Sequence, residues 1–123
     1  MTKEHVARVF KTAKFSKDAK KARITDAALC EAIGQVMAGQ ADDLGAGVFK
    51  KRLNQNMHRS IVLAKAASHW VFEYLYAKQD RSNIADDELA AFRLLAKAYA
   101  SLNAAQMDQL LADKDLLEMC HAP

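Results

Sequence analysis

Residues 48–81 restrict the possible folds more than any other part of the chain, because their residue pattern predicts three short strands joined by turns. Successive side chains of a strand point to opposite faces of its sheet. In the segment VFKKRL, Lys50 and Arg52 therefore share one face, and Lys51 lies on the other. Phe49 shares the face of Lys51, so we expect that face to be buried, with Lys51 near an edge.

The same stretch places cations at strand ends and in loops. Its predicted order after the first strand is a loop at 54–58, a strand at 60–65, a turn near 67–69 and a strand at 70–77. Four cations accompany these elements: Lys50, Arg52, Arg59 and Arg81. Positive charges gathered on one small sheet are what a protein needs to bind a polyanion such as a nucleic acid.

An aromatic pattern follows in the last of these strands. Trp70, Phe72, Tyr74 and Tyr76 recur at every second position, so they are predicted to share one face of the sheet. Such a stripe can stack on nucleic-acid bases. It can also pack against helices in a core, which is the commoner use of aromatic side chains.

Charge is divided unevenly along the chain. Residues 1–81 hold 15 Lys and Arg and 8 Asp and Glu, whereas residues 82–123 hold 3 and 7. A basic body followed by an acidic tail is typical of a protein that contacts nucleic acid through its first part. The alternative is a solvated surface whose sign differs without consequence. A length of 123 residues and an apolar fraction of 51% predict a single globular domain over residues 1–123.

The two cysteines, Cys30 and Cys120, have no spacing typical of a zinc site. Cys30 lies on a predicted helix and is expected to be a small buried apolar residue. Cys120 precedes His121, which leaves metal binding or a frayed tail as the alternatives. The first residues contain no apolar stretch typical of a secretion signal, and no apolar run approaches membrane length. We therefore expect a cytoplasmic protein with reduced thiols.

The remaining elements follow from periodicity and capping signals. Thr25 is a good N-cap, and Asp26 in the first turn suits the helix dipole, so a helix is predicted over 26–38. The other predicted elements are a strand at 6–12, a cationic amphipathic segment at 13–24, a polar connection at 40–47, helices at 86–102 and 104–112, and a final stretch that is either a short strand or an irregular tail. The fold class predicted is α+β, with a mostly antiparallel sheet of about four strands, two N-terminal helices and C-terminal helices.

Five segments in this order resemble the RelE/ParE superfamily of toxins from bacterial type II toxin–antitoxin modules, and within it a HigB-like branch of RelE-type toxins. They are VFKT at 9–12, ITDAALCEAI at 24–33, DLGAGVFKKRL at 43–53, AKQDRSNI at 77–84 and DDELAAFRLLA at 86–96. The last two are the most specific. Together the five segments span nearly the whole chain.

The resemblance implies a small RelE-like fold and an activity as an mRNA interferase, an endoribonuclease that cuts messenger RNA on the ribosome. It implies cleavage by attack of a ribose 2′-hydroxyl on the adjacent phosphate, with no metal and no small-molecule cofactor. Side chains must then take the hydroxyl proton, hold the pentavalent phosphorane and protonate the leaving 5′-oxygen. The implied partners are a cognate antitoxin and ribosome-bound mRNA, with no membrane.

The resemblance also implies roles for individual residues. Catalytic roles are expected of Lys50, Arg52, Arg59 and Arg81, and RNA binding is expected of Lys51, His58 and Lys78. Arg52 and Arg59 are expected to hold phosphate, because a planar guanidinium spans two oxygens. Lys50 is expected to transfer a proton, since neighbouring cations make a lysine release its proton more readily. Arg81 is expected to neutralise charge on the leaving side.

The chain departs from the family pattern at three places: its 54–58 loop has no Gly, and Gln79 and Ala85 stand where an arginine and a tyrosine are usual. Two alternatives to the nuclease therefore remain. One is a catalytically decayed protein of the same fold that binds an antitoxin or ribosome without cutting. The other is a ParE-type toxin that acts on DNA gyrase.

Overall fold

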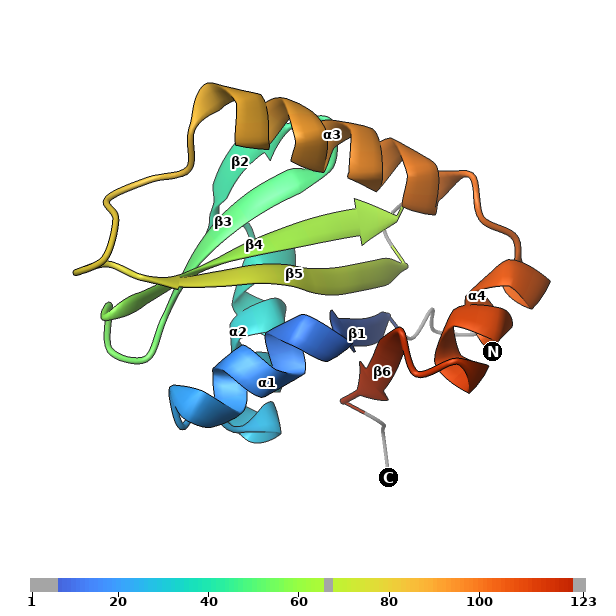
Figure 1. The fold of residues 1–123 in the computed structure, drawn as a ribbon, viewed down its shortest axis with the longest axis horizontal. Coiled ribbons are helices and arrows are strands. Elements are labelled where there is room, and N and C mark those ends of the chain that lie inside the picture. The colour runs from blue at the N-terminus through green and yellow to red at the C-terminus, as the bar shows by residue number, and fades with distance from the viewer. Residues whose placement is uncertain (1–6, 66–67, 121–123) are drawn as a thin grey trace.

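A computed structural model describes residues 7–65 and 68–120, which form one sheet and four helices (Figure 1). Its elements are β1 (Arg8–Thr12), α1 (Ala13–Lys21), α2 (Asp26–Met37), β2 (Asp42–Gly45), β3 (Val48–Leu53), β4 (His58–Lys65), β5 (His69–Ala77), α3 (Asp86–Ala100), α4 (Ala104–Ala112) and β6 (Leu116–Met119). The predicted helices and the three central strands are confirmed. Val6, Ala67 and His121, for which the sequence carries predictions, lie outside the described residues.

The strands form a sheet of six in the order β2-β3-β4-β5-β1-β6. Among the strands of the described residues, only β1 and β5 pair in parallel, so the prediction of a mostly antiparallel sheet is confirmed. The predicted number of about four strands is wrong, because β2 and β6 add an edge strand on either side. These edge strands are short and pair with one neighbour each. The sequence DDLG of β2 has no alternation of apolar and polar residues, which is the signal by which a strand is predicted. This is why the segment 40–47 was predicted to be a polar connection.

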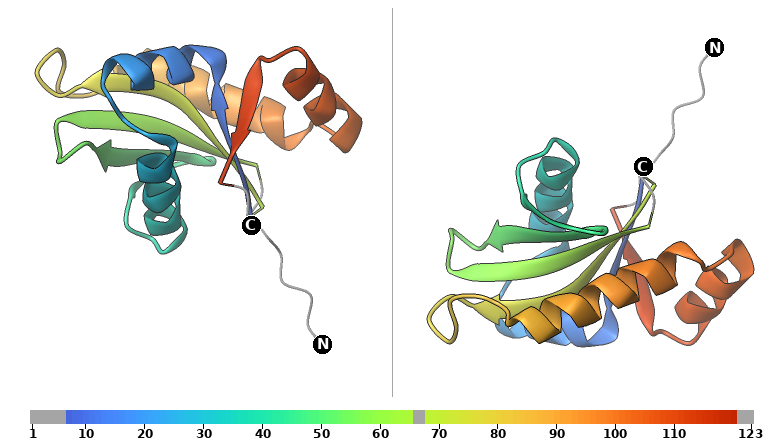
Figure 2. Two further views of the ribbon diagram at one scale, coloured as in Figure 1. Left: turned by 90° about the horizontal axis from the view of Figure 1, so that it is seen from below. Right: turned by 90° about the horizontal axis from the view of Figure 1, so that it is seen from above.

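The helices cover both faces of the sheet, with α2 on one face and α3 on the other (Figure 2). One apolar core lies under α2 and is built on Leu29, Ile33 and Phe72. The second core lies under α3 and α4 and is built on Phe10, Ile61 and other buried residues. Helix α1 continues the chain beyond β1 and lies beside β5, so that its apolar side joins the α2 core.

A β-bulge in β5 divides its aromatic residues between the two faces. In the β4–β5 pairing, Tyr74 and Phe72 face consecutive residues of β4, so Glu73 is the extra residue. Trp70 and Phe72 belong to the α2 core, whereas Tyr74 stacks on Tyr76 and packs on the α3 side. The prediction that all four aromatics share one face is therefore wrong. An extra residue reverses the side on which every later side chain lies.

Helix α3 is attached to the sheet by a stripe that is only partly buried. Phe92 and Tyr99 pack against the second core, but each remains partly exposed. Ala96 is the one buried residue of the helix, and Leu94 points outward with 70% of its surface exposed. Helix α3 thus holds fewer fully buried side chains against the sheet than α2, which has four.

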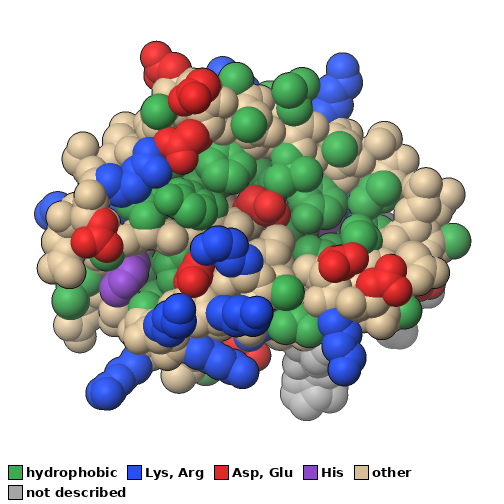
Figure 3. All heavy atoms as spheres, viewed as in Figure 1, with side chains coloured by type: hydrophobic (Ala, Val, Ile, Leu, Met, Phe, Trp, Pro, Cys, Tyr) green, Lys and Arg blue, Asp and Glu red, His purple; other side chains and the backbone are tan. Residues whose placement is uncertain are grey.

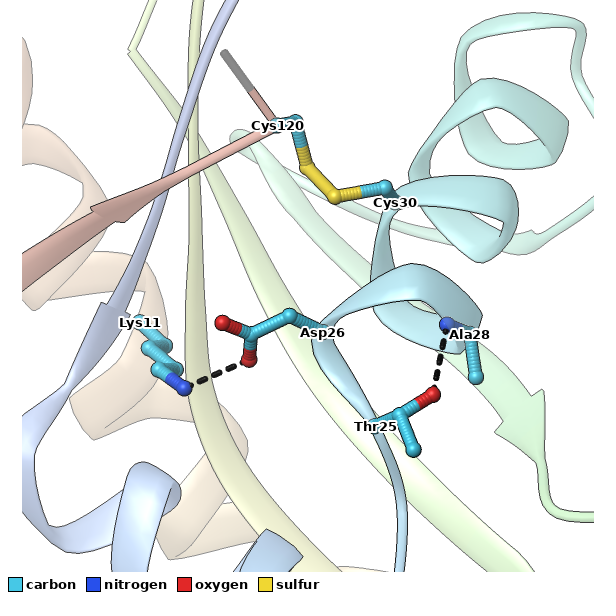
Figure 4. Close-up of a disulfide and its surroundings, with 6 residues drawn as sticks. All are labelled: Lys11, Thr25, Asp26, Ala28, Cys30 and Cys120. Atoms are coloured by element: carbon cyan, nitrogen blue, oxygen red, sulfur yellow. Dashed lines mark hydrogen bonds and ion pairs between the residues drawn. A yellow bond between two sulfur atoms is a disulfide. The ribbon is translucent and has the colours of Figure 1, made fainter.

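A disulfide joins Cys30 of α2 to Cys120 at the end of β6, with 5.5 Å between the two Cα atoms (Figure 4). The expectation of reduced thiols is therefore wrong, and so are the readings of Cys120 as a metal ligand or part of a frayed tail. The sequence offers no signal for the pair, since the cysteines lie 90 residues apart. Nearby, Lys11 of β1 forms an ion pair with Asp26 at the start of α2, 2.6 Å between Nζ and Oδ1. Both contacts hold α2 to distant strands.

Candidate nucleic-acid interface

Three neighbouring strands bring Arg52, Arg59 and Tyr76 into one row across the sheet. Arg59 of β4 lies directly opposite Arg52 of β3 and also directly opposite Tyr76 of β5. Directly paired residues point to the same face and lie about 5 Å apart at their Cβ atoms. Because β3 alternates as predicted, Lys50 shares this face with Arg52, two residues earlier in the strand.

Arg81 extends the row beyond Tyr76. Its guanidinium lies over the Tyr76 ring at 5.6 Å from the ring centre and donates to the Tyr74 hydroxyl at 3.3 Å. The same guanidinium forms a two-pronged ion pair with Glu88 in the first turn of α3. This hydrogen-bonded pairing raises the pKa of Arg81 and lowers that of the Glu88 carboxyl. Arg81 therefore fastens the start of α3 to the sheet, and its charge is largely neutralised.

Arg59 is more buried than the sequence indicated. It belongs to β4 rather than to the preceding loop, and only 8% of its surface is exposed. Its Nη1 donates to the backbone carbonyls of Asn56 and His58, at 2.9 and 3.2 Å. The guanidinium thus organises the 54–57 loop as well as facing the row. Arg52, in contrast, is exposed, and no partner of its side chain is recorded among residues 7–65 and 68–120.

Lys50 forms an ion pair with a carboxylate. Asp42 of the edge strand β2 lies opposite Lys50, with 3.6 Å between Nζ and Oδ2. The side chain of Lys50 is 18% exposed, whereas that of Asp42 is 61% exposed. The sequence predicted a crowd of cations around this lysine, but the added strand β2 supplies an acid instead. Lys50 therefore has a carboxylate within ion-pair distance of its ammonium group.

The three residues predicted to bind RNA do not lie together: Lys51 is separated from His58 and Lys78. Lys51 points to the other face, where its Nζ donates to the carbonyl of Gln40 at 3.1 Å. His58 and Lys78 come together at the end of the sheet, because His58 lies opposite Ala77, the residue before Lys78. Lys78 is exposed. His58 lies opposite Leu53 of the α2 core and therefore faces the same side as Lys51, whereas Lys78 follows β5 at the end of the sheet.

Tyr76 is a residue of the site that the sequence indicated only as one member of the aromatic stripe. It is 5% exposed, and its hydroxyl has no hydrogen-bond partner among the described residues. Burial raises the pKa of the Tyr76 phenol, while the charges of Arg59 and Arg81 lower it. The alternation of aromatics in the strand pointed to Tyr76, but the bulge that turns it toward the arginines has no sequence signal.

Further cations border this face along α1. Its exposed lysines are Lys14, Lys17, Lys20 and Lys21. Figure 3 shows Lys and Arg side chains gathered over α1, below a group of apolar side chains that lies under α3. Lys14 pairs with Asp18 at 2.7 Å. The face therefore carries lysines along one border and the aromatic residues Tyr74 and Tyr76 on the sheet between them and α3. Cations and aromatic rings in one groove are typical of proteins that bind single-stranded nucleic acid.

None of the helices in residues 7–65 and 68–120 is long and apolar enough to cross a bilayer. Within residues 7–65 and 68–120, no three or more His, Cys, Asp or Glu side chains are grouped as metal ligands.

A family model described as the RelE toxin of the RelE/RelB toxin–antitoxin system matches residues 7–119. The chain belongs to the RelE toxin family. This RelE-family toxin has no match among curated proteins and none among solved structures. Membership implies an antitoxin as partner, and RelE-family toxins are generally endoribonucleases. The mixed fold, with its cationic sheet face, agrees with the expectation that the sequence resemblance gave.

Proposed function

We propose that this RelE-family toxin is a ribosome-dependent mRNA interferase, of the HigB-like branch, that works in the cytoplasm until its antitoxin binds. The observation that carries the proposal is the pair of arginines facing each other on β3 and β4. Arg52 is exposed and Arg59 stands beside it, so one phosphate can meet two guanidinium groups at once. Planar guanidinium groups bind phosphate oxygens in pairs and stabilise charge that grows on them.

The reaction needs four events around one phosphate. The ribose 2′-hydroxyl loses its proton and its oxygen attacks phosphorus, a pentavalent phosphorane forms, the bond to the 5′-oxygen breaks, and that oxygen gains a proton. The products are a 2′,3′-cyclic phosphate and a 5′-hydroxyl. The step requires a proton acceptor, a proton donor and cations.

We assign these events to the row and its neighbours. Arg52 and the Nε and Nη2 groups of Arg59 hold the phosphorane oxygens, since the recorded bonds of Arg59 occupy Nη1. Lys50 is the proton-transfer residue, and the Asp42 carboxylate lies 3.6 Å from its Nζ. Arg81 supports charge on the leaving side, provided that RNA competes with Glu88 for its guanidinium.

The antitoxin is proposed to act on the same face. An acidic segment would complement the row and the α1 lysines, and displacement of the partly buried helix α3 is a second route. Either route removes the arginines from RNA.

The test is expression of the chain without an antitoxin, followed by primer extension on ribosome-bound mRNA. Wild type is expected to arrest growth and to leave discrete 5′ ends within translated codons. Arg52→Ala is expected to reduce cleavage about a hundredfold or more, because a preorganised donor to the transition state is lost. Lys97→Ala, which removes one exposed cation on α3, is the matched control and is expected to cut like wild type.

The other outcomes separate the competing functions. Arrest with a DNA-damage response and intact mRNA indicates a ParE-type toxin acting on gyrase. Absence of both arrest and cleavage, in a protein that still binds its antitoxin, indicates a catalytically decayed binder. Equal cleavage by wild type and Arg52→Ala would show that the arginine pair is not the site.

A further inference from the structure

The loop between β3 and β4 has a backbone conformation that its residues rarely adopt. Three consecutive residues have positive φ: 53° at Asn54, 54° at Gln55 and 70° at Asn56. Asn tolerates this left-handed region, but Gln has no local hydrogen bond that favours it, and three such residues in succession are unusual. Glycine would be the ordinary choice here, yet the loop contains none. Strain of this kind often accompanies a functional site.

Contacts from the rest of the site hold the loop in place. Nη1 of Arg59 donates to the Asn56 carbonyl at 2.9 Å, and the backbone N–H of Lys78 donates to the Met57 carbonyl at 2.9 Å. The Asn54 amide contacts Nδ1 of His58 at 3.1 Å. The loop is thus fixed from both neighbouring strands. A fixed loop presents its side chains in one arrangement, which lowers the entropy cost of binding a ligand.

The loop and the end of β5 enclose an open hollow of about 500 Å³, lined by residues 55–58 and 77–79. Gln55, Asn56 and Gln79 contribute amide side chains, each of which can donate and accept hydrogen bonds. Met57 contributes a thioether that is 59% exposed, one of the few large apolar side chains left in solvent. Lys78 adds a cation at the rim.

This lining matches the chemistry of a nucleobase. A base has flat apolar faces and an edge of mixed donors and acceptors, and proteins read splayed-out bases of single-stranded RNA by such edges. Amides match the edge, the thioether matches the face, and the cation matches the adjoining phosphate. An acidic peptide would instead need several cations here, whereas the exposed lysines gather on α1.

We propose that the hollow formed by residues 55–58 and 77–79 is a nucleobase subsite, which binds the base beside the phosphate held by Arg52 and Arg59. The placement rests on the proposed nuclease function. Asn56 links the two places, because it lines the hollow and its backbone carbonyl accepts a hydrogen bond from Nη1 of Arg59 at 2.9 Å. Gln55, Asn56 and Gln79 are then the residues that select among bases.

Binding is tested without the ribosome. The four ribonucleoside 3′-monophosphates are titrated one at a time into ¹⁵N-labelled protein, and the side-chain amide signals of Gln55, Asn56 and Gln79 are followed by NMR. The expected result is a shift of these signals, with the Kd of the best nucleotide at least about fivefold below that of the worst, the discrimination that one good base contact gives. The amide of Gln109 on α4, whose side chain bonds Asp113, is the internal control and is expected not to move.

Variants of the loop then test selection. Gln55→Gly and Asn56→Gly remove the amides while keeping the backbone, because glycine accepts positive φ freely. Each is expected to reduce the ratio of best to worst Kd at least about fivefold. On translating ribosomes the same variants are expected to cut at a wider range of codons, whereas Gln109→Ala keeps the wild-type pattern.

The outcomes separate this inference from the proposed function. Should no nucleotide move the three amides, or should all four bind with one Kd that the variants leave unchanged, the hollow is not a base subsite, even if the ribosomal cleavage is as proposed. Should the amides respond as expected while wild type cuts no mRNA, the subsite stands as an RNA-binding feature and the proposed nuclease function fails.

Discussion

Arg59 connects the chemistry of this protein with its stability. The residue is 8% exposed, and the guanidinium both faces Arg52 and donates to two carbonyls of the strained loop. A surface arginine can be removed at little cost to the fold, but a buried donor leaves its acceptors without a partner. Arg52, its exposed neighbour on β3, provides the matched comparison.

Arg59→Ala is therefore expected to have two effects. Cleavage in primer extension should fall about a hundredfold to a thousandfold, because a donor to the transition state is lost. The free energy of unfolding in urea should fall by about 1–3 kcal/mol, because the carbonyls of Asn56 and His58 lose their donor. Arg59→Lys should restore part of each, since an ammonium keeps the charge without the fork geometry. Arg52→Ala should lose cleavage alone. An Arg59→Ala protein that is as stable and as active as wild type would remove this residue from the site.

At the scale of elements, the β5 bulge places an acid beneath α3. Glu73 is the extra residue, and its carboxylate accepts a hydrogen bond from the Tyr99 hydroxyl of α3 at 3.4 Å. Burial raises the pKa of the Glu73 carboxyl from its ordinary 4.5 to about 7, and the Tyr99 contact opposes the shift only in part. The folded state therefore binds this proton more tightly than the unfolded chain does. The stabilisation is complete below about pH 4.5 and is lost as the pH rises through about 7.

The substitution Glu73→Gln tests this linkage between pH and the docking of α3. At about pH 8 the wild type holds a buried charge, so the neutral variant should be more stable by up to about 3 kcal/mol. At about pH 4.5 the two should be nearly equal, because Glu73 is then protonated. Urea unfolding at several pH values measures the difference. Glu31→Gln, an exposed substitution on α2, should show no such trend. A pH-independent difference between wild type and Glu73→Gln would show that Glu73 titrates normally.

At the scale of the whole molecule, the ends of the described chain are brought together in the sheet. β1 and β6 pair with each other, and the Cys30–Cys120 disulfide joins the end of β6 to α2 (Figure 4). The part of the chain between the two cysteines contains the three central strands and the row of arginines. A cross-link that spans 90 residues removes much of the freedom of the unfolded chain.

Breaking the disulfide is expected to lower the free energy of unfolding by about 4–5 kcal/mol, on the chain-entropy estimate for a loop of this length. Urea unfolding of wild type with and without a thiol reductant measures the effect. The Cys30→Ser variant should match reduced wild type and should not respond to the reductant. The disulfide does not form if the native protein in an oxidising buffer has two titratable thiols and the reductant leaves the midpoint of urea unfolding unchanged.

Local signals in the sequence were sufficient for much of this fold. The N-cap at Thr25 lies where it was predicted, and the helix predicted at 104–112 is capped by Asn103, which forms a capping box with Gln106. The alternation in VFKKRL correctly separated Lys50 and Arg52 from Lys51. Caps and alternation involve residues that are close in sequence, so a single chain displays them directly.

Amino-acid sequence alone thus determined the family, the helices, the central strands and the cations that the sheet carries. Tertiary structure alone decided the edge strands, the bulge at Glu73, the burial of Arg59, the carboxylate beside Lys50 and the disulfide. Each of these depends on which distant segment lies alongside. β2 is a strand only because β3 pairs with it, and Glu73 is extra only against the register of β4. Pairing between remote segments leaves no periodic trace in either one, and this is why the candidate site was predicted in its residues but not in its geometry.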